Sequence, residues 1–296
     1  MDSGNAKCFQ EVSGLKNYRL TTKIYKKIHL KSRNLKDLIN ENLIMIYETI
    51  KFEILEHVAC ITLNREEAAN ALNLKMAEEL MEAAIRCDTD EQIRAVLITA
   101  RGKMFCAGGD LKVFSEAESE VGKLAKQITT SLHAAISRFA RMAPPLVVAA
   151  NGTAAGGGLS LVLVADMVLA ARSAKFTLAY TRAGLVPDGS STYFLPRLIG
   201  LRRTRELIFS NRVLTAEEAL DWQLINRVLD DDQLQDEAER LAKTLSEGPL
   251  QTHGMIKQLL SDTFSSELES QMEAESRGLA TALSGNEGQE GIRAFL

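Results

Sequence analysis

The chain has few of the residues that build disulfide or metal sites. Its four cysteines, Cys8, Cys60, Cys87 and Cys106, stand far apart without a C-x-x-C pair, and its four histidines are equally scattered. Free thiols in a reducing compartment are therefore expected, which favours a cytoplasmic protein. We expect no metal ion.

Long apolar runs and blocks of one charge are missing from the main body of the chain. Without a run of about 18 apolar residues, no membrane span is predicted. The net charge of −4 over 296 residues argues against a nucleic-acid surface. The 46% of hydrophobic residues suffices for a sizeable core in one large domain or two smaller ones.

Residues 1–44 differ from the rest because they carry nine basic and only four acidic residues. Such a basic leader is typical of an organelle-targeting segment. The acidic residues and the presence of only two arginines favour a plainer interpretation, a poorly ordered extension or a start assigned upstream of Met45. We divide the remainder into a core, residues 45–245, and a helical C-terminal region, residues 246–296.

Hydrophobic periodicity predicts a β-β-α-β start to the core. A hairpin is expected over residues 50–54 and 57–63, a helix over 74–87 and a strand over 95–99. Later strands are expected at 146–150, 167–171 and 176–179, and later helices at 121–142, 161–165, 201–210, 216–221, 232–246, 248–262 and 265–283. This order predicts one α/β domain with a helical C-terminal part.

The predicted helices have clear apolar faces. In the helix over 74–87, the face is made by Met76, Leu80, Met81, Ala84 and Ile85. In the helix over 121–142, it is made by Leu124, Ile128, Leu132, Ile136 and Phe139.

Residues 151–160, Asn-Gly-Thr-Ala-Ala-Gly-Gly-Gly-Leu-Ser, join a buried strand to an apolar helix. Three glycines there let a ligand approach bare backbone N–H groups, which suits an anion or an oxyanion that forms during a reaction. A tight turn in which backbone packs on backbone explains the same residues equally well.

A second small-residue turn, residues 105–111 (Phe-Cys-Ala-Gly-Gly-Asp-Leu), also follows a strand. Two such turns could direct N–H groups at one carbonyl oxygen and form an oxyanion hole. Cys106 is a possible nucleophile by residue type, but a small buried cysteine is the more ordinary interpretation because no base is near it in sequence.

A third constellation surrounds Asp188, in the stretch Leu-Val-Pro-Asp-Gly-Ser-Ser. Pro-Asp-Gly is ordinary turn chemistry. The apolar flank also allows a partly desolvated carboxylate with a raised pKa, which suits a general base.

Four ordered motifs together resemble the crotonase superfamily, which includes enoyl-CoA hydratases, enoyl-CoA isomerases and aromatic acyl-CoA dehalogenases. The motifs are residues 64–72, 105–111, 151–159 with Asp166, and 195–200. The resemblance covers roughly residues 47–296. It implies an α/β spiral of β-β-α units, a C-terminal trimerisation region and a homotrimer or hexamer.

The resemblance also implies an acyl-CoA thioester substrate, with coenzyme A entering as part of the substrate and no separate cofactor. The N–H groups of Gly109 and Gly157 would hold the thioester oxygen as it becomes an enolate. The adenine and pantetheine parts would lie near Ala68, Ala71 and the segment Ala107, Gly108 and Asp110.

Two positions depart from the family hydratases, which carry a glutamate at each. This chain has Ser160 and Tyr180 there. Hydration needs a base for water and an acid for the α-carbon, so the resemblance argues against a standard hydratase. Tyr180 is expected to be a pocket wall with a polar tip.

Asp188 stands where the phenylacetate-pathway ring-enoyl isomerases and the dienoyl-CoA isomerases carry an acid/base aspartate. One carboxylate suffices for a 1,3-proton shift, so we predict an enoyl-CoA isomerase. A hydratase-type lyase and a catalytically reduced acyl-CoA-binding protein remain alternatives.

The 4-chlorobenzoyl-CoA dehalogenases also place an aspartate there, and they add a histidine at the position of His133 and a tryptophan at that of Tyr180. The missing tryptophan argues against this alternative. For His133, a core or interface histidine is the plain interpretation, and a substrate-binding or catalytic side chain is the alternative.

Overall fold

The computed structural model describes residues 47–296. The leader predicted over residues 1–44 lies outside the described residues. Within residues 47–296, none of the helices has both the length and the apolar character to cross a lipid bilayer.

A six-stranded sheet forms the centre, in the order β1-β2-β3-β5-β7-β10. Its strands are β1 Ile50–Leu55, β2 Val58–Leu63, β3 Ala95–Ala100, β5 Leu146–Ala150, β7 Met167–Ala171 and β10 Arg227–Leu229. The predicted hairpin is confirmed, since β1 and β2 pair antiparallel with Ile50 opposite Leu63. The other pairs are parallel, as expected where helices connect successive strands.

A second, four-stranded sheet has the order β4-β6-β8-β9. Its strands are β4 Met104–Cys106, β6 Thr153–Ala155, β8 Lys175–Thr177 and β9 Leu214–Thr215. Strands β3, β5 and β7 of the main sheet are each followed by one strand of this sheet. The chain therefore winds as a spiral of β-β-α units, and the predicted fold class is confirmed.

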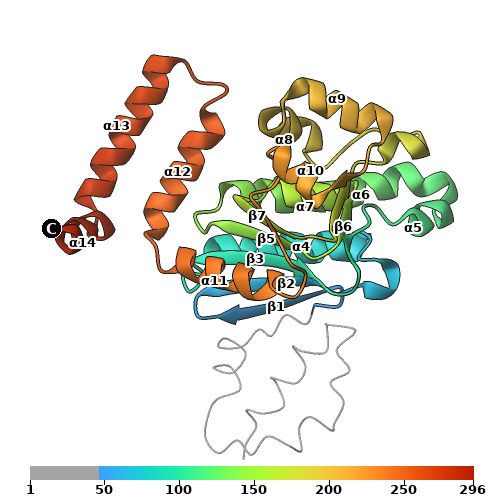
Figure 1. Ribbon diagram of the computed structural model, residues 1–296, viewed down its shortest axis with the longest axis horizontal. Coiled ribbons are helices and arrows are strands. Elements are labelled where there is room, and N and C mark those ends of the chain that lie inside the picture. The colour runs from blue at the N-terminus through green and yellow to red at the C-terminus, as the bar shows by residue number, and fades with distance from the viewer. Residues whose placement is uncertain (1–46) are drawn as a thin grey trace, which may run out of the picture. The chain divides into compact units, whose positions relative to one another are not determined.

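Helices α4 (Leu74–Thr89) and α6 (Val121–Arg141) pack against each other, and α4 also contacts β1. Helix α11 (Leu234–Ser246) packs on β2, β3, β5 and β7 of the main sheet (Figure 1). The buried face of α6 agrees with the prediction except at Leu124, which is half-buried. On α4, Ile85 is 45% exposed, so its placement in the apolar face is wrong. The face of α4 turns instead toward Ala83 and Cys87, at helical spacing from Met76 and Leu80.

Shorter helices connect the units. They are η2 Glu66–Ala68, α5 Leu111–Glu116, η3 Glu118–Glu120, α7 Gly157–Leu163, η4 Tyr180–Ala183, α8 Ser191–Leu198, α9 Gly200–Ser210 and α10 Ala216–Asp221. The apolar stretch predicted as a buried helix corresponds to α7, all of whose residues are buried.

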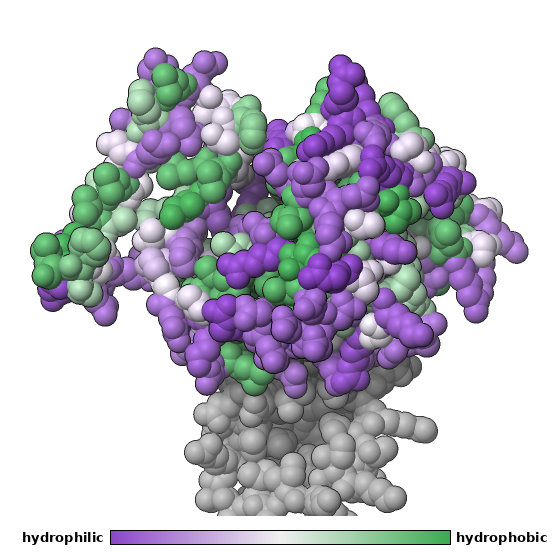
Figure 2. Space-filling model, in the orientation of Figure 1, coloured by the Kyte–Doolittle hydropathy of each residue, from purple (hydrophilic) through white to green (hydrophobic). Residues whose placement is uncertain are grey.

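The chain closes with four helices, α11 Leu234–Ser246, α12 Leu250–Asp262, α13 Leu268–Ser284 and α14 Asn286–Phe295. Large apolar side chains stay exposed on the last three helices and on the turn between α12 and α13: Ile256, Leu260, Phe264, Leu268, Met272, Leu279, Leu283, Ile292 and Phe295. Figure 2 shows apolar surface where Figure 1 draws α13 and α14. Such a surface is typical of an oligomer interface and is consistent with the predicted trimerisation region. Trimerisation itself stays a prediction.

Candidate active site

The two glycine turns predicted from the sequence meet backbone to backbone. A Cβ placed on Gly108 would lie 2.8 Å from the Ala155 carbonyl oxygen and 3.4 Å from the Gly157 nitrogen, and Gly108 has a φ of +94°. A Cβ on Gly158 would lie 2.4 Å from the Cys106 carbonyl oxygen. Only glycine allows this approach, so the tight-packing explanation is correct for Gly108 and Gly158.

Where the two turns meet, the backbone N–H groups of Gly109 and Gly157 have no acceptor within residues 47–296. The Leu72 N–H donates to the Gly108 carbonyl and the Asp110 N–H donates to the Leu72 carbonyl, which fixes the turn around Gly109. Within residues 47–296, neither the Gly109 N–H nor the Gly157 N–H donates to another protein group. The two turns thus present unused donors from neighbouring parts of the backbone.

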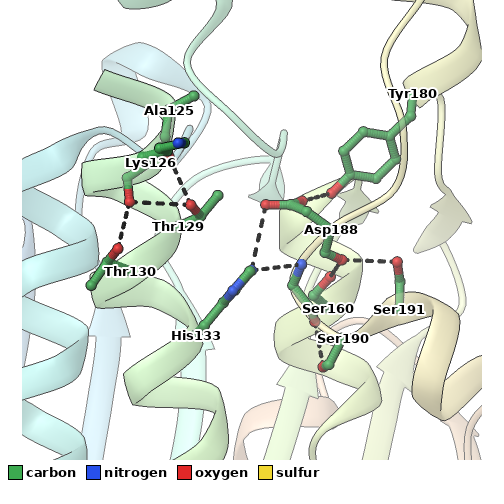
Figure 3. Close-up of polar contacts among 11 residues, drawn as sticks. Ala125, Lys126, Thr129, Thr130, His133, Ser160, Tyr180, Asp188, Ser190 and Ser191 are labelled. Atoms are coloured by element: carbon green, nitrogen blue, oxygen red, sulfur yellow. Dashed lines mark hydrogen bonds and ion pairs between the residues drawn. The ribbon is translucent and has the colours of Figure 1, made fainter. Parts of the chain in front are cut away.

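The Asp188 carboxylate faces these turns through the side chain of Tyr180. The Tyr180 hydroxyl donates a hydrogen bond to Asp188 Oδ1, as Figure 3 shows. That hydroxyl is also 3.9 Å from a Cβ placed on Gly157. Tyr180 therefore lies between the glycine turn and the carboxylate, and the polar tip predicted for it reaches Asp188.

Burial and the neighbouring Asp188 carboxylate raise the pKa of the Tyr180 phenol well above its usual range. The phenol consequently stays protonated and acts as a donor. Its position follows from the backbone, because Ala179 adopts a left-handed conformation at the start of η4 and redirects the chain after β8. The strand predicted over residues 176–179 ends early, at Thr177, for the same reason.

His133, on α6, approaches the other carboxylate oxygen, with Nε2 3.9 Å from Asp188 Oδ2. Its Nε2 accepts a hydrogen bond from the Gly189 N–H at 3.2 Å. That nitrogen therefore carries no proton in this arrangement. The side chain is 51% exposed, so His133 is not a core histidine, and its interpretation as an interface histidine stays a prediction.

Hydrogen bonds to the backbone carbonyl oxygen of Asp188 anchor the loop that carries this residue. This oxygen accepts hydrogen bonds from the Ser160 hydroxyl at 3.2 Å, the Ser191 hydroxyl at 2.9 Å and the Ser191 N–H at 3.1 Å. The Asp188 side chain is 31% exposed, so it is less buried than the apolar flank suggested. No local sequence pattern indicates this role of Ser160 and Ser191.

Gly189 is required beside Ser160. Its φ is +58°, and a Cβ there would lie 2.6 Å from Ser160 Oγ. Ser160 itself is fully buried. The position where family hydratases carry a glutamate is thus a packed contact and not an open pocket.

Cys106 is buried in the same region, under Gly158. Burial raises the pKa of its thiol to about 12, which keeps it protonated at neutral pH. The plain interpretation of Cys106 as a small buried side chain is therefore supported, because a nucleophilic cysteine needs a thiolate.

Asp110, predicted to contact substrate, is occupied within the protein. Its carboxylate forms an ion pair with Arg65 at 3.0 Å and caps α5 by accepting from the Val113 N–H. Arg65 also donates to the carbonyl oxygen of Ala71. Arg65, which belongs to the first motif, is the residue that the sequence analysis missed as the organiser of this segment.

The other predicted substrate contacts, Ala68, Ala71 and Ala107, lie in the same segment. The Ala107 N–H donates to the Ala69 carbonyl oxygen, and the Ala71 N–H donates to that of Ala68.

Within residues 47–296, no group of three or more metal-ligand side chains occurs.

The model of the enoyl-CoA hydratase/isomerase family matches residues 53–296. The chain is 35% identical over 250 residues to a 1,2-epoxyphenylacetyl-CoA isomerase of Escherichia coli, covering 84% of this chain and 95% of the relative. It is 34% identical over 227 residues to a 4-chlorobenzoyl coenzyme A dehalogenase of an Arthrobacter species, covering 76% of this chain and 82% of the relative.

Among solved structures, an enoyl-CoA hydratase from Polaromonas superposes with a TM-score of 0.80 at 31% identity. That match covers 83% of this chain and 96% of the other. The fold, the family match and these relatives agree, and the chain belongs to the enoyl-CoA hydratase/isomerase family of the crotonase superfamily.

Proposed function

We propose that the protein is an enoyl-CoA isomerase in which Asp188 moves a proton along the acyl group. The observation that carries the proposal is the position of the Asp188 carboxylate. The Tyr180 hydroxyl holds one of its oxygens and lies beside Gly157, whose N–H is unused within the described residues. The proposed base therefore lies close to Gly157, one of the two glycines whose N–H groups are proposed to hold the thioester oxygen.

The proposed reaction starts from a 3-enoyl thioester. Asp188 Oδ2, the carboxylate oxygen that Tyr180 does not bind, removes a proton from C2 of the acyl group. The electrons spread over C2 to C4 and the thioester oxygen, which becomes a dienolate oxygen held by the Gly109 and Gly157 N–H groups. The protonated carboxyl returns the proton to C4, which leaves a 2-enoyl thioester and the ionised Asp188.

The lack of a glutamate at positions 160 and 180 supports an isomerase over a hydratase. Ser160 and Tyr180 occupy the two hydratase glutamate positions, and both side chains are engaged with Asp188 or its loop. A general base for water would need its own place in the site. The E. coli relative, named as an isomerase, is consistent with this assignment.

The test is incubation with a 3-enoyl-CoA while the conjugated 2-enoyl thioester is followed by its ultraviolet absorbance. Asp188→Asn should lower the rate by about 10²–10⁴-fold, the usual contribution of a general acid/base. His133→Ala should retain most of the rate. A wild-type protein that converts no enoyl, dienoyl or ring thioester would contradict the proposal, and retained coenzyme A binding would then favour the acyl-CoA-binding alternative.

A dehalogenase is the second candidate because His133 lies close to Asp188. In that case Asp188 would attack an aromatic ring, and His133 would serve as base for water. The Arthrobacter relative carries a dehalogenase name. Chloride release from 4-chlorobenzoyl-CoA that is lost in His133→Ala would favour this candidate over the isomerase.

A further inference from the structure

A cavity of about 630 Å³ lies beside the proposed active site, between α6, α8, the end of α7 and α12. Its walls are mainly apolar, and include Ile136, Leu163, Phe194, Leu260 and Phe264. A cavity of this size and lining fits a small organic group or a chain of methylenes.

His133 separates the cavity from Asp188. The imidazole lines the cavity on one side, and its Nε2 lies 3.9 Å from Asp188 Oδ2 on the other. Figure 3 shows His133 reaching from α6 toward the loop of Asp188 and Ser190, and Ser190 also lines the cavity. An acyl group whose reacting carbons face Asp188 would reach this space by passing the His133 side chain, which is half exposed.

The far part of the cavity is cationic. Its one carboxylate, Asp166, is already bound by Lys257 at 2.7 Å and by the Leu146 N–H at 2.8 Å. Arg141 and Arg197 also line it, and neither pairs with a carboxylate within residues 47–296.

The two arginines are placed by their own elements. Arg141 ends α6 on the same helical face as His133 and Ser137, and the helix rises about 12 Å over the eight steps from His133 to Arg141. Arg197 is fixed by donating to the Tyr193 carbonyl oxygen, with its guanidinium 3.6 Å from the Tyr193 ring centre. A cationic end thus follows an apolar passage.

We propose that this cavity binds the distal end of the acyl group and selects thioesters that carry a second carboxylate there. The inference rests on the proposed function for the orientation of the acyl group. The apolar walls cover the methylenes, and the planar guanidinium of Arg141 matches a carboxylate in two parallel hydrogen bonds. The substrate class is therefore the half-thioester of a medium-length unsaturated dicarboxylic acid.

The test uses saturated thioesters, which bind without reacting. Calorimetry compares the affinities for octanedioyl-CoA and octanoyl-CoA. The affinities for hexanedioyl-CoA and decanedioyl-CoA show which chain length the cavity prefers. The wild-type protein should bind octanedioyl-CoA about two- to fivefold more tightly than octanoyl-CoA, the range for a charge pair at a solvent-open site. Added salt should reduce this preference.

Arg141→Gln should abolish the preference for octanedioyl-CoA, and Arg141→Glu should reverse it. Both should leave the affinity for octanoyl-CoA unchanged. Arg138→Gln is the matched control, because Arg138 lies on α6 one turn away, pairs with Asp88 and does not line the cavity. Thermal melts of the variants verify that each one folds.

Equal affinity of the wild-type protein for the two thioesters, or a preference that survives in Arg141→Gln, would overturn the inference. So would a failure of both thioesters to bind. The isomerase assay is read separately, because the proposed function is tested by turnover and this inference by the binding of unreactive thioesters.

Discussion

Replacing Tyr180 by phenylalanine tests how the proposed base is held. The substitution removes one hydroxyl, the donor to Asp188 Oδ1, and keeps the ring that packs beside Gly156 and Gly157. The Asp188 backbone stays in place because its carbonyl oxygen keeps three other donors. Only the carboxylate gains freedom to rotate.

The magnitude follows from the orientation that is lost. The hydrogen bond stabilises the ionised carboxylate of the resting enzyme at least as much as it stabilises the transition state, so its energy alone does not raise the barrier. The barrier rises because the freed carboxylate must be oriented again for each reaction, and fixing such a side chain costs about 0.5–1.5 kcal/mol. We therefore expect kcat to fall by up to about tenfold. KM should change little, because Tyr180 is not the predicted holder of the thioester.

The assay is the conversion of 3-enoyl-CoA by Tyr180→Phe and by a matched control, Tyr47→Phe. The Tyr47 hydroxyl is buried with no hydrogen-bond partner within the described residues, so its removal should leave kcat unchanged. A Tyr180→Phe variant as fast as the wild type would refute the reasoning, since the carboxylate would then need no orienting donor. A change confined to KM would show that Tyr180 contacts the substrate instead.

Three further predictions concern packing and pH. Ser160→Glu should destabilise the protein by about 1–3 kcal/mol, because position 160 is buried against Gly189, and thermal melts measure this loss. The same variant should not hydrate 2-enoyl-CoA, which a hydration assay checks. Gly108→Ala should destabilise the protein by ~1–3 kcal/mol, because Gly108 has a positive φ and faces a backbone carbonyl. Its control, Gly122→Ala, lies in open space on α6 and should be neutral or stabilising by about 1 kcal/mol. Denaturant unfolding measures both variants. Because the folded-state pKa of Tyr180 is raised, its contribution to stability is complete below the unfolded pKa of about 10 and is lost as pH rises above it. Urea unfolding above pH ~10 should therefore show stability falling more steeply in the wild type than in Tyr180→Phe, by up to about 1.4 kcal/mol per pH unit, and equal slopes would contradict this.

Five of the six strands of the main sheet could be predicted from the sequence because they are long enough to show a pattern, whereas β10, with three residues, was missed. Strand β2 alternates buried and half-buried residues, and β5 is a continuous apolar run. Strands β4 and β6 have three residues each, too short for any period, and were missed as strands. The second sheet depends on contacts between units, which no local pattern contains.

The candidate site could be predicted only in part. The glycine turns and Asp188 carry local signals, since three glycines and a Pro-Asp-Gly turn are visible in the sequence. The contact between Tyr180 and Asp188 is not visible, because it depends on the left-handed backbone at Ala179. The approach of His133 likewise needs the packing of α6 against the loop that contains Asp188.

The close packing of Ser160 against Gly189 connects two features of the site: the lack of a glutamate at position 160 and the presence of Asp188. The Asp188 loop passes so close to α7 that even a Cβ on Gly189 would meet the Ser160 hydroxyl. In this loop conformation, a glutamate at position 160 has no room, and the small hydroxyl stabilises the loop by donating to Asp188. The chain can therefore hold the carboxylate of Asp188 or that of a glutamate at 160, but not both in this geometry. This packing constraint is consistent with the proposed site, in which Asp188 is the single acid/base carboxylate and moves a proton between two carbons.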